Sequence, residues 1–335
     1  MPYLSSKLLL QSNDTGKKSR RMHRVRSFCF ALSTVPLIFL NSAVAQEGFS
    51  VIQTVRSNQL HLFAPVSVNG SAIKWWLVDT GAPVSLVAPE LARSLALPPA
   101  RQGENVTVTN VGKKYSVVSA QSVKCMDMEL GPAYLVAEPI EFPTEKTRQA
   151  RIAFEKEGLL GMNLLVKHGA VINCRTQQIF FSRNGRQLPL TREGYEKMGF
   201  TYIPIRITPR GYVEAEGTVG QSPYSFVIDT GAVFTTLEPA IRDRARLAYY
   251  DTRRQIRMPY ARAKGTNLTV AEVPSFRLGA HDMSDLQLGF AETRAGDFGV
   301  VHEYGGLIGA ELLFKRHAII DLGNRALYLM ADNKR

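Results

Sequence analysis

Cysteine, tryptophan and histidine are scarce in this chain of 335 residues, which contains three cysteines, two tryptophans and six histidines. The histidines are dispersed and no H-x-x-x-H pattern occurs, so the sequence predicts no metal site. The phrase G-x-S-x-G is missing, and no cysteine has neighbours typical of a nucleophile, which argues against a serine or cysteine hydrolase. These absences favour a chemistry that uses neither a metal nor another cofactor.

Long apolar runs are missing after residue 45, so we expect no stable membrane insertion of the mature chain. Within the first 45 residues, the apolar stretch 27–40 is short for crossing a bilayer and follows a basic segment. Ala43-Val44-Ala45 then supplies the small-x-small pattern of a cleavage site. We predict a signal peptide over 1–45, cleaved near Ala45, and a secreted or periplasmic protein. An uncleaved anchor is the alternative, and Met22 is an alternative start.

Basic residues exceed acidic residues, 41 to 29, which gives the whole chain a net charge of +12. The leader carries seven of the basic residues and one acid, Asp14, so the mature chain has 34 minus 28, or +6. Its basic residues are scattered, without interleaved aromatic residues, and no nucleic-acid partner is expected.

Two of the three cysteines, Cys125 and Cys174, belong to the mature chain and lie in its first half. In an oxidising compartment they are candidates for a disulfide, but two buried free thiols are an equally open reading. The second half has Leu322 where the first half has Cys174, so a bridge would not be shared by the two halves.

A phrase of six residues occurs twice, as LVDTGA at 77–82 and as VIDTGA at 227–232. A proline follows each of these aspartates by ten residues and suits the first turn of a helix. A later phrase also repeats, as LLGMNLL at 159–165 and as LIGAELL at 307–313. A third Asp-Thr-Gly, at 14–16, has no apolar run before it and is assigned no role. Self-similarity over this span indicates two lobes related by a pseudo-two-fold axis.

The two phrases place Asp79 and Asp229 at the ends of apolar runs. A carboxylate at the end of a buried strand is costly, because burial disfavours its charged form. Two such carboxylates in matching halves predict a facing pair that shares one proton and performs acid–base chemistry.

Short apolar or alternating runs separated by turn residues dominate both halves. Asn69-Gly70 predicts a hairpin turn, and strands at 106–108 and 115–118 predict a second hairpin with a basic tip. A counterpart is expected around 263–270. We therefore predict a mostly β protein with two pseudo-symmetric, β-barrel-like lobes, each with one short helix. The predicted lobes are residues 46–185 and residues 186–335.

The two phrases with Asp-Thr-Gly-Ala, each followed by an apolar-apolar-Gly strand, resemble the aspartic peptidases, the group of pepsins and retroviral proteases. The resemblance covers most of residues 60–330, and implies the bilobal acid-protease fold. Ala82 and Ala232, after the glycines, look more like the retroviral members, so the chain resembles a secreted bacterial-type peptidase made of two fused retroviral-protease-like lobes.

The resemblance implies roles for named positions. The implied catalytic pair is Asp79 and Asp229. The residues implied to support them, through hydrogen bonds between lobes and close backbone approach, are Thr80, Gly81, Thr230 and Gly231. Gly161 and Gly309 would lie on strands behind the aspartates. The residues of a hairpin that would close over substrate are Gly112 and Lys113.

The activity implied is that of an aspartic endopeptidase, whose carboxyl pair activates a water against a peptide bond. The expected partner is a peptide or protein substrate, bound by a monomer. A hydroxyl residue at 82 or 232 would give the charged pair one more stabilising hydrogen bond, which alanine lacks. The hypothesis therefore includes an activity optimum at about pH 4–6. The alternative is a catalytically inactive module of the same fold that binds peptides or cell-wall fragments.

Overall fold

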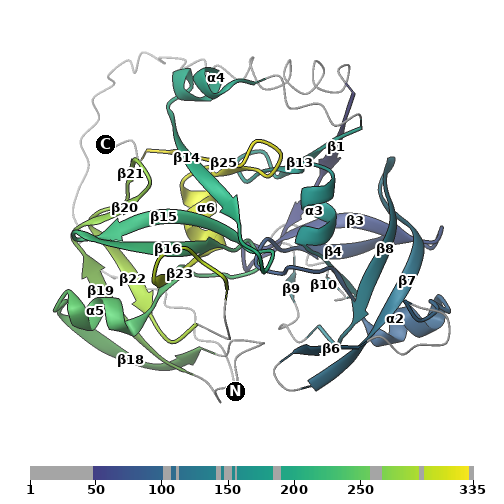
Figure 1. Ribbon diagram of the computed structural model, residues 1–335, viewed down its shortest axis with the longest axis horizontal. Helices are drawn as coiled ribbons and strands as arrows, with labels where there is room; N and C mark the ends of the chain where they lie inside the picture. Colours follow the sequence, from purple (N-terminus) through teal and green to yellow (C-terminus); the bar gives the residue numbers. More distant parts are fainter. Residues whose placement is uncertain are drawn as a thin grey trace, which may run out of the picture.

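Two lobes of β-strands lie side by side, and a shared sheet crosses the top of both lobes in the view of Figure 1. The structure is a computed structural model that describes residues 48–100, 107–110, 113–140, 145–146, 153–154, 157–183, 190–256, 266–293 and 298–331. Within these ranges no helix has the length and apolar character needed to span a membrane. The mostly β, bilobal fold expected from the sequence is confirmed.

The N-terminal lobe is a sheet in the order β2-β3-β4-β11-β5-β8-β7-β6, and a further pairing of β3 with β7 closes it into a barrel. Its strands are β2 (Val55–Arg56), β3 (Leu62–Val68), β4 (Lys74–Val78), β5 (Leu86–Val87), β6 (Thr107–Asn110), β7 (Lys113–Cys125), β8 (Met128–Ala137) and β11 (Gly158–Leu160). A separate two-stranded sheet is formed by β9 (Glu145–Lys146) and β10 (Ala153–Phe154).

The C-terminal lobe repeats this plan in the order β14-β15-β16-β23-β17-β22-β19-β18. The short strand β20 comes soon after β19 and pairs with β15, as β7 pairs with β3 in the other lobe. The strands are β14 (Phe200–Ile207), β15 (Val213–Val219), β16 (Ser222–Ile228), β17 (Thr236–Leu237), β18 (Tyr249–Ile256), β19 (Thr266–Val273), β20 (Phe276–Leu278), β21 (His281–Asp282), β22 (Leu286–Phe290) and β23 (Tyr304–Ile308).

The sheet shared by the lobes runs β1-β13-β12-β24-β25-β14. Its remaining strands are β1 (Phe49–Gln53), β12 (Val171–Asn173), β13 (Gln178–Ser182), β24 (Ile319–Asp321) and β25 (Ala326–Met330). The lobes meet where β12 and β24 pair antiparallel, with Ile172 opposite Ile320. The predicted boundary between residues 185 and 186 lies outside the described residues.

Each lobe contains more than the one short helix predicted from the sequence, so that detail was wrong. The helices are α2 (Pro89–Ser94), α3 (Met162–Lys167), α4 (Arg192–Lys197), α5 (Pro239–Arg244) and α6 (Ala310–Lys315). The expected pair, α2 and α5, begins at the two prolines. The pair α3 and α6 was missed because a short apolar run does not distinguish a buried helical turn from a strand.

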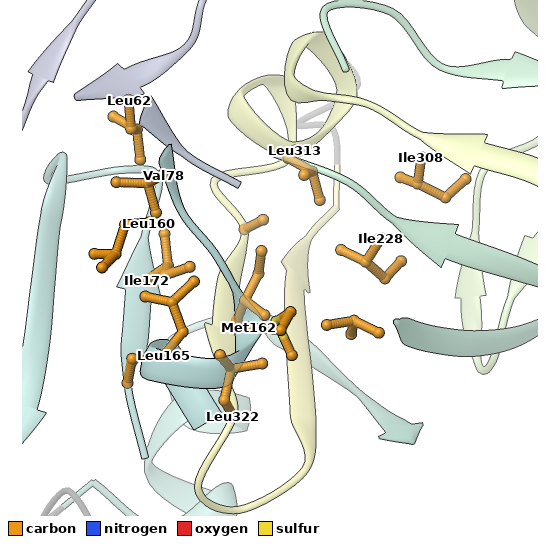
Figure 2. Packing of buried hydrophobic residues seen from close by; sticks show 14 of the residues in the cluster. Leu62, Val78, Leu160, Met162, Leu165, Ile172, Ile228, Ile308, Leu313 and Leu322 are labelled. Atoms are coloured by element: carbon orange, nitrogen blue, oxygen red, sulfur yellow. The ribbon is translucent and has the colours of Figure 1, made fainter. Parts of the chain in front are cut away.

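One hydrophobic cluster spans both lobes, and Figure 2 shows its central part. Val78 and Leu160 come from one lobe, and their counterparts Ile228 and Ile308 come from the other. All four side chains are fully or almost fully buried, which accounts for the apolar runs before each Asp-Thr-Gly. The apolar residues of the repeated phrases in both lobes therefore belong to one common core.

Cys125 and Cys174 belong to the same cluster as free thiols. Burial raises the pKa of each thiol to about 12, so neither carries the thiolate needed for reaction. Of the two readings that the sequence left open, the structure has the buried free thiols.

The hairpin expected at 106–118 is formed by β6 and β7, with Asn110 opposite Lys113. Gly112 lies outside the described residues, and only the backbone of Lys113 is described. The counterpart in the second half is formed by β18 and β19, with Ile256 opposite Thr266. The pairing of both hairpins is confirmed, whereas their proposed contact with substrate stays a prediction.

We expect Gly158→Ala to destabilise the N-terminal lobe, because a Cβ at this position would overlap the indole ring of the fully buried Trp76. Overpacking of this kind costs about 1–3 kcal/mol. The matched control is Gly220→Asn, in a turn where φ is +60° and no heavy atom lies within 4 Å of the added Cβ. Urea unfolding would measure both variants. Equal midpoints for Gly158→Ala and the parent would contradict the tight packing of Trp76.

Candidate active site

The two aspartates stand at matching places in the two lobes, each directly after a central strand. Asp79 follows β4, which lies parallel to β11, and its N–H donates to the carbonyl of Leu160 at 3.1 Å. Asp229 follows β16, which lies parallel to β23, and its N–H donates to the carbonyl of Ile308 at 3.0 Å. The backbone of each aspartate is thus attached to a strand from much later in the same lobe.

The carboxyl groups of Asp79 and Asp229 are joined by a side-chain hydrogen bond across the lobe boundary. Each also accepts from its own loop, since Gly81 N donates to Asp79 Oδ1 and Gly231 N donates to Asp229 Oδ1, both at 2.8 Å. Ala232 N adds a second donor to Asp229 Oδ1 at 3.0 Å. The structure therefore brings together the two aspartates that the sequence singled out.

Gly81 and Gly231 are needed for the close approach of the two loops. A Cβ at Gly81 would overlap the carboxyl group of Asp229, and a Cβ at Gly231 would overlap that of Asp79. Each glycine therefore packs against the acid of the opposite lobe, and any side chain at either position would separate the pair.

Burial raises the pKa of Asp79 well above its ordinary value, and the charge of Asp229 raises it further. Burial also raises the pKa of Asp229, while the N–H donors of its loop and the hydrogen bond with Asp79 work in the opposite direction. Two carboxylates in contact do not both ionise cheaply. The pair holds one proton between them over a range of pH that reaches above the ordinary carboxyl value.

Thr80 and Thr230 lock the two loops together by a reciprocal set of hydrogen bonds. Thr80 N donates to Thr230 Oγ1 and Thr230 N donates to Thr80 Oγ1, both at 3.0 Å. The Thr80 hydroxyl donates to the carbonyl of Ile228 at 2.7 Å, and the Thr230 hydroxyl donates to that of Val78 at 2.8 Å. The hydrogen bonds between lobes that the resemblance implied are present, and every one is buried.

A polar pair that the sequence analysis missed supports the loop of Asp79 from behind. Asn163 Oδ1 accepts from Ser85 N at 2.8 Å and from the Ser85 hydroxyl at 2.7 Å. Ser85 Oγ in turn accepts from Gly161 N at 2.9 Å. Gly161 caps the N-terminus of α3, so this chain of bonds ties the aspartate loop to that helix.

The loop of Asp229 has the same support from different residues. Glu311 Oε2 accepts from Thr235 N at 2.8 Å and from its hydroxyl at 3.3 Å, and Thr235 Oγ1 accepts from Gly309 N at 3.0 Å. Burial raises the pKa of Glu311. The signal in the sequence was a polar residue at the same offset in both repeats, Asn163 and Glu311, inside otherwise apolar phrases.

An aromatic group lies beside the aspartates on the C-terminal lobe. Tyr212 packs against the same small hydrophobic cluster as Ala232, the last residue of the Asp229 phrase, and burial together with the charges of Asp229 and Asp79 raises the pKa of Tyr212. The ring of Tyr212 packs edge-on against Phe298 at 4.7 Å, and Phe298 stacks on Tyr304, also at 4.7 Å between centroids.

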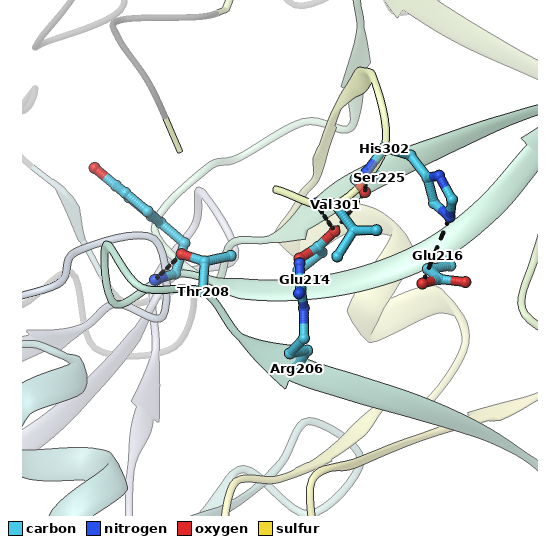
Figure 3. A network of polar contacts seen from close by, with 8 residues as sticks. Arg206, Thr208, Glu214, Glu216, Ser225, Val301 and His302 are labelled. Atoms are coloured by element: carbon cyan, nitrogen blue, oxygen red, sulfur yellow. Dashed lines mark hydrogen bonds and ion pairs between the residues drawn. The ribbon is translucent and has the colours of Figure 1, made fainter. Parts of the chain in front are cut away.

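A polar network around the buried side chain of Glu214 holds Val301 and His302 against the strands β15 and β16, as Figure 3 shows. Glu214 accepts from Val301 N at 2.9 Å and from the hydroxyl of Ser225, and it pairs with Arg206. His302 N donates to Ser225 Oγ at 3.0 Å. Burial opposes the charge of Glu214, but the bonds from Ser225, Arg206 and Val301 outweigh it and lower the pKa of Glu214.

Comparison with known proteins identifies matching segments in both lobes. A family model described as Aspartyl protease matches residues 64–164 and 215–312, and each segment contains one of the two aspartates. No curated protein matches the chain.

Similar solved structures include the basic 7S globulin from soybean, with 12% identity over 84% of this chain and 94% of that chain and a TM-score of 0.46. Conglutin gamma, a basic 7S globulin from lupine seeds, has 11% identity over 85% and 95%, with a TM-score of 0.42. An aspartic proteinase from Irpex lacteus has 13% identity over 85% and 98%, with a TM-score of 0.46. The strand pairings establish the bilobal β fold by themselves.

Thr230→Val is expected to lower the free energy of unfolding by about 2 kcal/mol or more, because Thr80 N and the Val78 carbonyl would be left buried without their partner. Thr230→Ser keeps the hydroxyl and serves as the matched control, with a smaller loss. Urea unfolding at neutral pH gives both values. The interlocking role would be contradicted by a valine variant as stable as the serine variant.

Glu214→Gln is expected to cost about 1–3 kcal/mol at pH 7, since it weakens the buried bonds from Ser225 and Val301 and removes the charge that pairs with Arg206. A lowered native pKa means that this stabilisation is complete above the ordinary glutamate value and is lost as pH falls through the native value. The difference from the parent should therefore shrink below about pH 4. Glu216→Gln, at an exposed neighbour, is the control. A difference that stays constant with pH would refute the charged network.

Proposed function

Because the chain belongs to the aspartyl protease family, we propose that it is an aspartic endopeptidase whose catalytic pair is Asp79 and Asp229. The observation that carries the proposal is the hydrogen-bonded pair of carboxyl groups, one from each lobe, whose pKa values are both raised. Two carboxyl groups in contact share one proton, because both do not ionise cheaply. Such a pair offers a base and an acid at the same place and the same pH, which is what the attack of water on an amide needs.

The proposed reaction proceeds through proton transfers between the two carboxyl groups and the reacting atoms. The ionised carboxylate takes a proton from a water molecule as the water oxygen bonds to the carbonyl carbon of the scissile peptide. The protonated carboxyl gives its proton to the carbonyl oxygen, which leaves a neutral tetrahedral diol. The diol collapses when the newly protonated carboxyl gives its proton to the departing nitrogen. The C–N bond breaks, and a hydroxyl proton of the diol returns to the other carboxylate, so the pair recovers its single proton.

The surrounding bonds support this chemistry by keeping the two carboxyl groups in fixed positions. The loops that carry Asp79 and Asp229 are joined by the bonds of Thr80 and Thr230, and each loop is tied to a helix behind it. Carboxyl groups held in place beforehand need no reorganisation when charge moves during the reaction. Since burial raises both pKa values, we propose activity in mildly acidic solution.

We propose that the substrate is an extended segment of a peptide or protein, bound by a monomer between the lobes. The hairpin of β6 and β7, whose last described pair is Asn110 with Lys113, would cover the substrate and pair with its backbone as an added strand. The leader over 1–45 leads us to propose that the mature enzyme acts in the periplasm or outside the cell.

Asp79→Asn and Asp229→Asn are each expected to lower kcat/KM at least about a hundredfold, because either change removes one of the two proton-transfer groups. The measurement is cleavage of a mixed peptide library by residues 46–335 between pH 3.5 and 7.5, where the parent should give a bell-shaped profile. Asp251→Asn is the matched control, since Asp251 is an exposed carboxylate on β18. That control should retain the activity of the parent.

Unfolding of the same proteins distinguishes a lost reaction from a lost fold. A raised native pKa means that ionising Asp79 or Asp229 costs the native state stability as pH rises, so both asparagine variants should be at least as stable as the parent at pH 7. Activity that survives in both variants would refute the catalytic pair. A folded parent that cleaves nothing would favour the inactive peptide- or cell-wall-binding module.

A further inference from the structure

The first turn of α6 is bonded through its backbone to the loop that follows Asp229. Ala310 N donates to the carbonyl of Ala232 at 2.8 Å, and Glu311 N donates to the carbonyl of Val233 at 3.0 Å. The N–H of the same Ala232 donates to Asp229 Oδ1 at 3.0 Å. A single residue therefore connects the helix to the carboxyl group, so a shift between the loop and α6 would reach Asp229 directly.

The side chain of Glu311 binds the far end of the same loop. Its Oε2 accepts from Thr235 N at 2.8 Å and from the Thr235 hydroxyl at 3.3 Å, and Thr235 Oγ1 accepts from Gly309 N at 3.0 Å. Thr235 is only 2% exposed, so an N–H left there without its acceptor would be costly. Of the bonds between the loop and α6, the two to Glu311 Oε2 are those that a substitution on the helix can remove.

The N-terminal lobe has the same set of bonds with an amide in place of the carboxyl group. Met162 N donates to the carbonyl of Ala82 at 2.9 Å, and Asn163 N donates to the carbonyl of Pro83 at 3.1 Å. The amide oxygen of Asn163 makes the bonds that Glu311 Oε2 makes in the other lobe. An amide is uncharged at every pH, so this arrangement requires an acceptor oxygen and does not require a negative charge.

The electrostatics of Glu311 agree with a role that needs no charge. Burial raises the pKa of Glu311, and the bonds from Thr235 and from the backbone of α6 oppose this rise without cancelling it. The group is therefore neutral over more of the acidic range than an ordinary glutamate. Glu214 of the same lobe is the opposite case, because its pKa is lowered and it pairs with Arg206.

We propose that Glu311 is a positioning residue that holds the loop of Asp229 by its acceptor oxygen and not by its charge. The neutral acid suffices, as the amide of Asn163 does in the other lobe. A loop bonded to α6 at both ends keeps Gly231 N and Ala232 N on Asp229 Oδ1, which keeps the carboxyl group in its place. The effect on the reaction rate rests on the proposed peptidase function, whereas the holding of the loop does not.

The kinetic test compares substitutions that keep the acceptor oxygen with one that removes it. Glu311→Gln and Glu311→Asn, the second of which copies the other lobe, should keep kcat within about threefold of the parent. Glu311→Leu should lower kcat at least about tenfold and change KM less than about twofold, because a reacting group is displaced and no substrate contact is lost.

The matched control is Glu90→Leu, at an exposed glutamate in the first turn of α2, which should keep the parental kcat. A parental kcat in folded Glu311→Leu overturns the proposal. A tenfold loss in Glu311→Gln also overturns it, because the charge would then be what the loop needs.

A second test needs no peptidase activity. Amide hydrogen exchange is followed by NMR at about pH 5, where the amides of Gly231, Ala232 and Thr235 should exchange at least about tenfold faster in Glu311→Leu than in Glu311→Gln. The amide of Gly81, in the other loop, should be unchanged. Equal rates in the two variants overturn the proposal.

The exchange measurement separates failure of the inference from failure of the proposed function. Should the parent cleave no peptide, the exchange rates decide by themselves. Should Glu311→Leu fail to fold, Glu311→Gln and Glu311→Asn decide against the parent. Parental exchange in both supports the acceptor role, and faster exchange of the Asp229 loop in both overturns it.

Discussion

The carboxyl groups of Asp79 and Asp229 repel each other when charged, and the surrounding structure holds them in contact nevertheless. Their loops are attached to each other by the hydrogen bonds of Thr80 and Thr230, and each carboxyl accepts N–H donors from its own loop. The cost of burying two acids is offset only if those bonds stay made. The barrel of each lobe and the shared sheet therefore act as a frame for one small cluster of backbone and threonine groups.

The pseudo-two-fold symmetry of this frame is close in its backbone and loose in its side chains. The same bonds behind the aspartate loops are made by an amide, Asn163, in one lobe and by a carboxylate, Glu311, in the other. The same turn ends in His61 in one lobe and in Tyr212 in the other. A fused pair of lobes can differentiate in this way, whereas a dimer of identical chains keeps both sides alike. The two carboxyl groups therefore occupy unequal surroundings.

Much of the fold followed from repetition in the sequence, because two copies of an apolar run ending in Asp-Thr-Gly have few explanations. Helices α3 and α6 were missed since six residues behind a glycine give no periodicity to separate a helical turn from a strand. His61 and Tyr212 were missed for another reason. Their equivalent places in two matching turns depend on local hydrogen bonds, and neither residue stands in a recognisable phrase. The state of Cys125 and Cys174 likewise depended on tertiary placement that spacing does not specify.

The long reach of the aspartate bonds has a consequence for the timing of folding. Asp79 is attached to Leu160, 81 positions later, and Asp229 to Ile308, 79 positions later, while the threonines pair over 150 positions. Contacts so distant in the chain form late, after the loops between them have closed. No segment shorter than nearly the whole chain can assemble the carboxyl pair. An unfinished polypeptide that lacks β23 therefore cannot hold Asp229 in place, so any chemistry of the carboxyl pair must wait until the last strands have been made.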